Sequence, residues 1–223
     1  MSTAAPKSKS ARPVRRTKNA SPPVARTQVA RREAAEQRLL DAAIRLISER
    51  GIKGTTLGDV GEAAGYSSGL TAHHYKTKGG LLTAVTAEIH RRFRRALADA
   101  DLPEPGLPRL LATVDVYLAV KDVSSARALA LIQKEALAQQ SEYRGILRKF
   151  NRQSVDGIVA QIQAGVEKGE IRRDVNALAE ASLMLAAMRG SRAQWLQLGD
   201  KVDLVKVAKE LKDHLRRSLA VTV

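Results

Sequence analysis

The sequence contains no cysteine, so disulfide bonds and thiolate metal sites are excluded. Aromatic residues make up only 3% of its 223 residues, although 44% are apolar. No apolar run approaches the roughly 20 residues that a membrane span needs, and the basic N-terminus lacks the apolar stretch of a secretory signal. Alanine and leucine dominate the apolar content. We therefore expect an all-α protein in the cytoplasm, with no membrane partner.

Acidic residues are missing from the first 32 positions, where much of the net charge of +15 is concentrated. This segment is also rich in proline and serine, and it has too little apolar surface to fold alone. We expect residues 1–30 to form a disordered basic arm. Two interpretations stay open: a solvated tail, or an arm that neutralises DNA phosphates or enters a minor groove. Nine basic side chains lie in residues 1–32: Lys7, Lys9, Arg12, Arg15, Arg16, Lys18, Arg26, Arg31 and Arg32.

The segment Thr55–Leu82 predicts two short helices joined by a tight turn, followed by the start of a third helix. Thr56 and Asp59 have capping-box spacing at the start of the first helix. Gly65 can adopt the left-handed conformation that ends it, and Ser67 can cap the next helix. This unit typically places its second helix in the major groove of DNA.

The same segment resembles the TetR family of bacterial transcriptional regulators, with agreement over about residues 33–93. The matching positions are Thr56, Val60, Gly61, Ala64, Gly65, Tyr66, Ser67, Gly69, His73, Tyr75, Lys78, Leu81 and Leu82. Three residues depart from the family pattern. Ala72 replaces a common tyrosine, Gly58 replaces a polar residue, and Gly61 replaces an alanine, which fits tight helix packing at a helix-propensity cost of about 1 kcal/mol.

Candidate DNA contacts fall into two groups. Ser68, Thr71 and His73 can hydrogen-bond base edges, whereas Leu70 and Ala72 suit thymine methyl groups. The resemblance also implies that Gly69 faces the bases. Phosphate contacts are expected for residues at helix starts and at the end of the recognition helix. With the expected cap included, the predicted DNA-binding set is Thr56, Ser67, Ser68, Gly69, Leu70, Thr71, Ala72, His73, His74, Lys76 and Lys78.

Apolar periodicity predicts a first helix from about Arg31 to Arg50, ended by Gly51, and a longer helix from Lys78 to Ala100. The breaker Asp101–Pro108 then suggests a domain junction. We expect a helix-turn-helix domain over 31–100 and a helical effector-binding and dimerisation domain over 101–223, about nine helices in all. Five helices are expected beyond the junction, at about 107–120, 123–140, 142–168, 174–198 and 203–219.

No constellation of residues predicts an enzyme. Gly65–Gly69 spells the G-x-S-x-G pattern of serine hydrolases, but that motif requires a preceding strand and the segment before it is helical. His73 and His74 are adjacent, so on a helix their side chains diverge by about 100° and cannot chelate a metal together. We expect no catalytic residue, no metal and no cofactor.

The C-terminal half carries no motif, but the family resemblance implies an effector pocket among its central helices. The tentative ligand-binding residues are Tyr117, Phe150, Met184, Met188 and Trp195, and ordinary core packing is the alternative for each. Arg189 or Arg192 would favour an anionic effector if buried. The resemblance also implies a four-helix dimer interface from the last two helices. Their apolar stripes are Leu178, Ala181, Leu185 and Met188, and Leu204, Val207, Leu211 and Leu215.

These observations favour a homodimeric regulator, most simply a repressor, that binds a palindromic DNA operator and is released by an unknown small-molecule effector. It would associate with the nucleoid when bound to DNA. One alternative is a constitutive architectural DNA-binding protein without a ligand switch, dominated by the basic arm. A small all-α enzyme is a second alternative, and the absence of an acid/base or metal cluster in the sequence argues against it.

Overall fold

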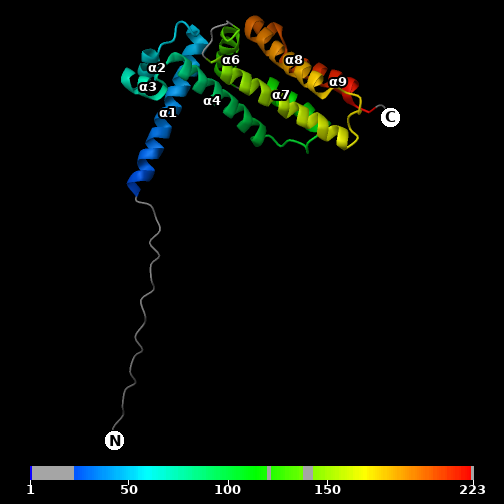
Figure 1. The fold of residues 1–223 in the computed structure, drawn as a ribbon, viewed down its shortest axis with the longest axis horizontal. Coiled ribbons are helices and arrows are strands. Elements are labelled where there is room, and N and C mark those ends of the chain that lie inside the picture. The colour runs from blue at the N-terminus through cyan, green and yellow to red at the C-terminus, as the bar shows by residue number, and fades with distance from the viewer. Residues whose placement is uncertain (2–22, 120–121, 138–142, 222–223) are drawn as a thin grey trace. The chain divides into compact units, whose positions relative to one another are not determined.

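A computed structural model describes residues 1, 23–119, 122–137 and 143–221, and these residues form nine α-helices (Figure 1). A short 3-10 turn, Gly199–Lys201, separates the last two helices, and in this part of the chain the β structure is one isolated bridge between Ile171 and Ala220. The helices are α1 (Pro23–Arg50), α2 (Leu57–Ala63), α3 (Ser68–Tyr75), α4 (Lys78–Asp99), α5 (Leu107–Leu118), α6 (Val123–Glu135), α7 (Arg144–Glu167), α8 (Ala177–Leu198) and α9 (Leu204–Leu219). The all-α prediction is confirmed.

Helix α1 begins at Pro23, eight residues before the predicted start at Arg31. Proline suits the first turn of a helix because its fixed φ is already helical and its missing N–H would be unpaired there. Disorder is therefore the wrong prediction for residues 23–30, which are helical; residues 2–22 lie outside the described part. The end of α1 is as predicted, because Gly51 follows it with a φ of 73°.

The helix-turn-helix has the predicted local signals, with one exception. At the start of α2, the Asp59 amide donates to Thr56 Oγ1 (3.1 Å) and the Thr56 amide donates to Asp59 Oδ2 (2.8 Å), which completes a capping box. Gly65 has a φ of 76° in the turn. Ser67 occupies the N-cap position of α3 as predicted, but its side chain makes no capping hydrogen bond with the described residues.

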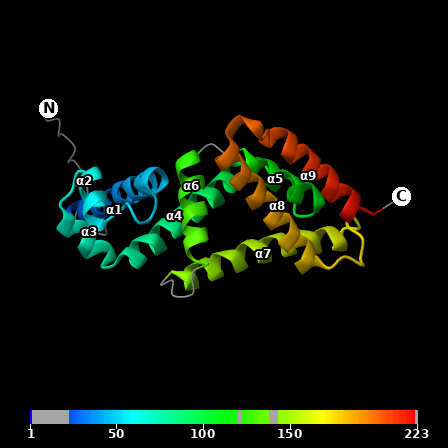
Figure 2. The ribbon, with the colours of Figure 1, turned by 90° about the horizontal axis from the view of Figure 1, so that it is seen from above.

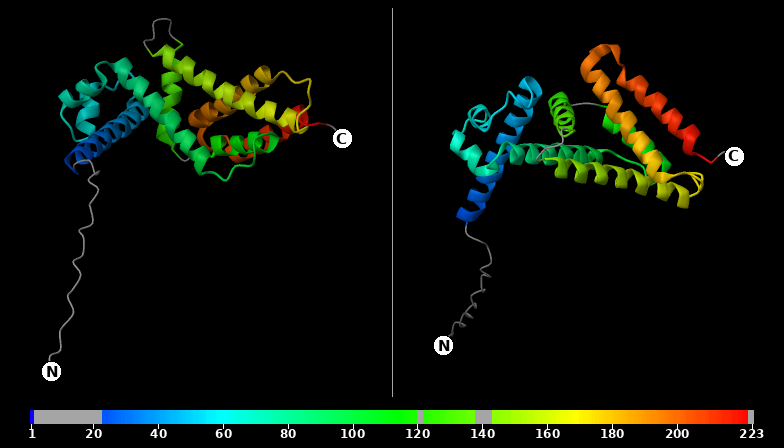
Figure 3. Two further views of the ribbon diagram at one scale, coloured as in Figure 1. Left: turned by 60° about the horizontal axis from the view of Figure 1, so that its bottom comes forward. Right: turned by 45° about the horizontal axis from the view of Figure 1, so that its top comes forward.

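Two hydrophobic clusters form the core of the unit Glu36–Val223. The first joins α1, α2 and α4 to α6, and it contains the predicted α1 stripe of Leu40, Ala43, Ile44 and Ile47. The second lies among α5, α7, α8 and α9, which lie together in Figure 2 and Figure 3. Helix α6 packs against α4 and is therefore part of the core that supports the helix-turn-helix.

The predicted breaker after residue 100 is the loop between α4 and α5, where Gly106 adopts a φ of 140°. The five helices expected beyond it are present with shifts of a few residues at their ends. Residues on both sides of this loop belong to one compact unit, so the division at residue 100 stays a prediction. Among the helices described, none is long and apolar enough to cross a membrane.

The predicted dimer stripes mostly face the core of their own chain. Ala181, Leu185 and Met188 of α8 and Leu215 of α9 are buried in the second cluster. Leu204, Val207 and Leu211 are half-buried and pack against the same cluster. An apolar stripe cannot by itself reveal which neighbour covers it. Leu178 is the one member of the predicted stripes that is exposed, and the other exposed large apolar side chains described on these helices are Leu183, Leu198 and Val205.

Candidate functional site

The exposed face of α3 presents three of the predicted base-contacting residues. Gly69, Ala72 and His73 are exposed, and Leu70 is half-buried. The side chain of Ser68 lies outside the described part of the structure. Because Gly69 and Ala72 are small, another surface can approach the α3 backbone closely at these positions, while His73 supplies a hydrogen-bonding group beside them.

Thr71 does not lie on this face, so its predicted contact with a base edge is wrong. Its side chain is fully buried, and its Oγ1 has no hydrogen-bond partner within the described residues. The reason is the close approach of α2: a Cβ at Gly61 would lie 2.7 Å from Thr71 Oγ1 and 3.0 Å from the Ser67 carbonyl oxygen. Gly61 thus permits the tight α2–α3 packing that the sequence suggested.

The predicted phosphate contacts gather at helix ends around α3. Thr56 is exposed at the N-terminus of α2, and Lys78 is half-buried at the N-terminus of α4. Lys76 is exposed just after α3 with a φ of 56°, a left-handed conformation that is uncommon for a residue with a side chain. His74 is half-buried, and its ring meets that of His73 edge to face, with centroids 6.1 Å apart. These side chains, which can donate hydrogen bonds, thus lie around α3.

A cavity of about 990 Å³ lies among α4, α5, α7 and α8. Tyr117, Phe150 and Met188 line it, as the sequence predicted for an effector pocket. Met184 and Trp195 do not, so for these two residues the prediction is wrong. Met184 is buried within the second hydrophobic cluster, and Trp195 lies three residues past Arg192, the last α8 residue of the lining.

Two aromatic contacts join α4 to the far walls of the cavity. His90 stacks on Phe150 with ring centroids 4.3 Å apart, and Phe93 meets Tyr117 edge to face at 5.5 Å. Burial lowers the pKa of His90 to about 4, and the nearby charges of Arg189 and Arg94 act in the same direction. His90 is therefore neutral at pH 7. His90, Phe93 and Arg94 of α4 also line the cavity, and none of them belongs to the predicted ligand-binding set.

Arg192 lies against Tyr117 in the wall of the cavity. Its guanidinium carbon is 3.6 Å from the centroid of the Tyr117 ring, and its Nη2 donates to the Tyr117 carbonyl oxygen. Its Nε is buried with no partner among the residues described. Arg189 donates to Asn151 Oδ1 at 2.6 Å. Burial lowers the pKa of both arginines, and for Arg192 the charge of Arg189 lowers it further.

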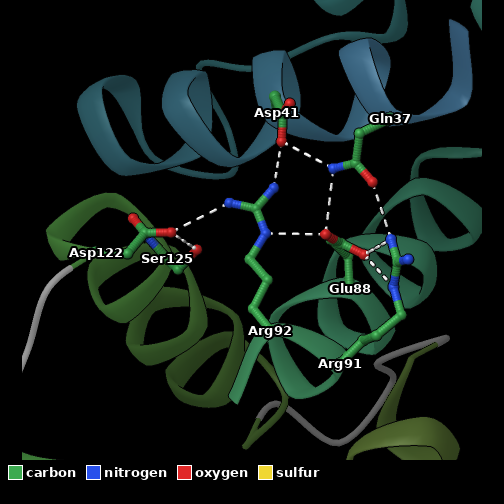
Figure 4. A network of polar contacts seen from close by, with 7 residues as sticks. All are labelled: Gln37, Asp41, Glu88, Arg91, Arg92, Asp122 and Ser125. Carbon is green, nitrogen blue, oxygen red and sulfur yellow. Dashed lines mark hydrogen bonds and ion pairs between the residues drawn. The ribbon is translucent and has the colours of Figure 1, made fainter. Parts of the chain in front are cut away.

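A polar network ties α4 to α1 and α6 (Figure 4). Arg92 Nε donates to Glu88 Oε1 at 2.9 Å, while its other nitrogens pair with Asp41 of α1 and with Asp122, the N-cap of α6. Arg91 and Gln37 complete the coordination of the Glu88 carboxylate. Burial alone would raise the pKa of Glu88, but the hydrogen bonds from Arg92, Arg91 and Gln37 lower it below its usual value.

In the sequence of α4, the residues of this network alternate with residues that line the cavity. Arg92 holds α1 and α6, whereas His90, Phe93 and Arg94 line the cavity.

An all-α chain with a helix-turn-helix near its N-terminus and a cavity among its C-terminal helices defines a ligand-accommodating DNA-binding architecture. A sequence profile described as "Bacterial regulatory proteins, tetR family" matches residues 39–85, which span the end of α1, α2, α3 and the start of α4. This match and the relatives below support the resemblance of the chain to the TetR family of transcriptional regulators.

Curated relatives match over most of their length. The HTH-type transcriptional regulator BetI of Burkholderia mallei (strain NCTC 10229) is 28% identical over 199 residues, which are 86% of this chain and 97% of the relative. The HTH-type transcriptional repressor KstR2 of Rhodococcus jostii (strain RHA1) is 26% identical over 179 residues, which are 77% and 84% of the two chains. These relatives are named as regulators, in agreement with the prediction that the chain is not an enzyme.

Solved structures share the fold. A TetR transcriptional regulator from Chloroflexus aurantiacus J-10-FL superposes with a TM-score of 0.73 at 20% identity, covering 85% of this chain and 98% of the other. A transcriptional regulator from Saccharomonospora viridis in complex with choline has a TM-score of 0.74 at 20% identity, covering 85% and 100%.

Proposed function

We propose that this TetR-family regulator is a repressor that binds a palindromic operator as a homodimer and is released when a small molecule occupies the cavity. The observation that carries the proposal is the dual position of α4. Its N-terminus follows α3 directly after a two-residue turn, and its C-terminal half lines the cavity. One helix therefore connects the two regions that a ligand-controlled DNA-binding protein must couple.

In this proposal α3 enters the major groove. Gly69, Leu70, Ala72 and His73 face base edges, with His73 as the principal hydrogen-bonding group. Thr56, Ser67, His74, Lys76 and Lys78 lie around α3 and contact phosphates, which sets the register of the helix without reading sequence. The unusual left-handed conformation of Lys76 supports this role, because strained backbone is often retained at functional sites.

The homodimer is proposed to form through α8 and α9. Leu178, Leu183 and Leu198 of α8 and Val205 of α9 are exposed, and water-exposed apolar side chains of this size favour association. A twofold axis through this surface would present two α3 helices to two half-sites of one operator. Light scattering of the full chain should give twice the mass of 24.2 kDa.

The network around Arg92 supplies the proposed coupling. A ligand that displaces α4 at His90 and Phe93 would change the distances from Arg92 to Asp41 and Asp122, and hence the orientation of α1 and the helix-turn-helix. By linkage, the effector would weaken operator binding by the same factor by which the operator weakens effector binding, typically about 5–150-fold.

The alternative is a constitutive architectural DNA-binding protein whose basic N-terminal segment dominates. Selection of bound DNA from a random duplex pool distinguishes the two. Enrichment of an inverted repeat, with roughly 1–3 kcal/mol lost per mismatched important base pair, supports the proposal. Equal binding of the enriched and scrambled duplexes at about 0.15 M salt, a physiological ionic strength, supports the alternative. A regulator of either kind would act in the cytoplasm, on the nucleoid.

A further inference from the structure

The charge of the cavity wall is strongly one-sided. Five of its side chains are cationic and one, Asp101, is anionic; the cations are Arg94, Arg109, Lys149, Arg189 and Arg192. Among the described residues, none of these cations forms an ion pair with a carboxylate. Arg189 donates a hydrogen bond to the side-chain amide oxygen of Asn151, and Arg109 Nε donates to the Pro103 carbonyl oxygen at 2.5 Å.

Arg192 is the cation that a ligand can best complement. Its guanidinium is partly desolvated, it lies beside a second cation, Arg189, and its buried Nε lacks a partner in the described structure. Arg192 lines the cavity, so a ligand oxygen there can accept a charge-assisted hydrogen bond from its guanidinium. The planar fork of arginine also matches the two oxygens of a carboxylate or sulfonate.

The same geometry disfavours a cationic ligand. An aromatic face is the surface that attracts a quaternary ammonium group, and the face of Tyr117 is already covered by Arg192. The positive wall would repel such a group further. The choline bound by the structurally similar regulator from Saccharomonospora viridis is therefore a poor guide to the ligand of this cavity.

Most of the remaining wall is apolar, with a few uncharged polar side chains such as Thr113, Gln153 and Gln161. Aliphatic side chains from several helices line the cavity, among them Leu97, Leu102, Leu110, Ile158, Leu185 and Met188. A cavity lined mostly by apolar groups with a few convergent polar ones binds molecules of mixed character, whose apolar part supplies affinity and whose polar part sets orientation.

Resting on the proposed ligand-controlled function, we propose that the effector is an amphipathic organic anion, with its acid group on Arg192 and Arg189 and its apolar body against these aliphatic side chains. The acid group lies beside the Arg192 guanidinium, and the second cation holds its remaining oxygen. The recognition needs no metal and no covalent step.

The test uses matched probes that differ only in the head group. Decanoate, decanol and decyltrimethylammonium each contain an unbranched chain of ten carbons, with the carboxyl carbon of decanoate counted as one, and anilinonaphthalene sulfonate and N-phenylnaphthylamine share one ring system. Binding to the full chain without DNA is measured by calorimetry for the first set and by fluorescence for the second. In each set we expect the anion to bind about 10-fold or more tightly than its neutral or cationic counterpart, as charge-assisted hydrogen bonds predict.

Variants assign this preference to the cavity. Arg192→Met should reduce the affinity for the anions about 10-fold or more and leave the neutral probes nearly unchanged. Arg192→Lys should keep part of the preference, because it retains the charge without the fork. Arg148→Gln is the matched control, since Arg148 is exposed on α7 and does not line the cavity. If Arg192→Met fails to fold by circular dichroism, Arg189→Met provides the same comparison.

Equal binding within both probe sets, tighter binding of the ammonium probe, or an unchanged anion affinity in Arg192→Met would overturn the inference. Operator affinity is measured separately, with and without decanoate. Anion binding that depends on Arg192 but leaves operator affinity unchanged supports the ligand class and contradicts the proposed release. Intact operator binding with no anion preference contradicts the ligand class and leaves DNA binding unaffected.

Discussion

Glu88 and Arg92 lie one turn apart on α4, and their side chains meet with Arg92 Nε 2.9 Å from Glu88 Oε1. The Glu88 side chain is only 3% exposed, whereas that of Arg92 is 31% exposed and also reaches Asp41 and Asp122. A buried carboxylate is thus kept ionised by an arginine that simultaneously contacts two other helices. This pair connects the stability of the helix-turn-helix to the position of α6.

Arg92→Met should therefore lower stability and weaken coupling between the cavity and DNA. We expect a loss of about 1–3 kcal/mol in the free energy of unfolding, less than for a fully buried pair because Arg91 and Gln37 still contact Glu88. Urea denaturation measures it. Arg95→Met is the control, since Arg95 is exposed on the same helix. Equal midpoints for the two variants would show that the network contributes nothing to stability.

The half-buried His90 predicts a loss of stability in mild acid. Its pKa is about 4 in the folded chain and 6.5 ordinarily, so the unfolded chain binds the proton first as the pH falls. The His90 contribution is complete above about pH 6.5 and is progressively lost between 6.5 and 4. Denaturation midpoints at pH 7.5 and pH 5 should thus differ less in His90→Phe, which preserves the ring stack on Phe150. His214→Gln, at an exposed histidine, should behave like the unmodified chain.

The unpaired hydroxyl of Thr71 predicts a stabilising substitution. Thr71→Val replaces a buried group that lacks a partner in the described structure with a methyl of similar size, and it should raise the free energy of unfolding by about 1 kcal/mol. The same substitution at Thr77 should destabilise by about 1 kcal/mol, because Thr77 Oγ1 accepts from the Gly80 amide at the start of α4. Thermal unfolding compares the two. A destabilised Thr71→Val would indicate that the hydroxyl has an acceptor.

His73→Ala and Lys78→Ala should impair DNA binding in different ways. Loss of His73 should reduce discrimination at one or two base positions, by about 1–3 kcal/mol. Loss of Lys78 should weaken all duplexes alike and lower the log–log salt slope by about 1. Fluorescence anisotropy on the selected operator and a scrambled duplex separates the effects. The same change in specificity from both variants would contradict the proposed docking of α3.

Local signals made the N-terminal region readable from sequence. The capping box of Thr56 and Asp59, the left-handed Gly65 and the apolar stripe of α1 depend on neighbours within a few residues, so their pattern sufficed. Thr71 was misassigned because its orientation depends on how closely α2 approaches α3. Helix α1 begins before the predicted residue because proline favours the first turn of a helix, and residues 23–30 are helical despite their low apolar content.

Sequence alone determined the fold class, the helix-turn-helix and the family, since these follow from periodicity, caps and motif spacing. Tertiary structure alone decided which side chains meet. His90 stacks on Phe150, Arg192 covers one face of Tyr117, and Met184 and Trp195 do not line the cavity. The physical reason is that some properties depend on one helix and others on several helices in contact. A helical pattern fixes the direction of a side chain relative to its own axis, but burial, a cavity and a charge without a partner are properties of several helices packed together.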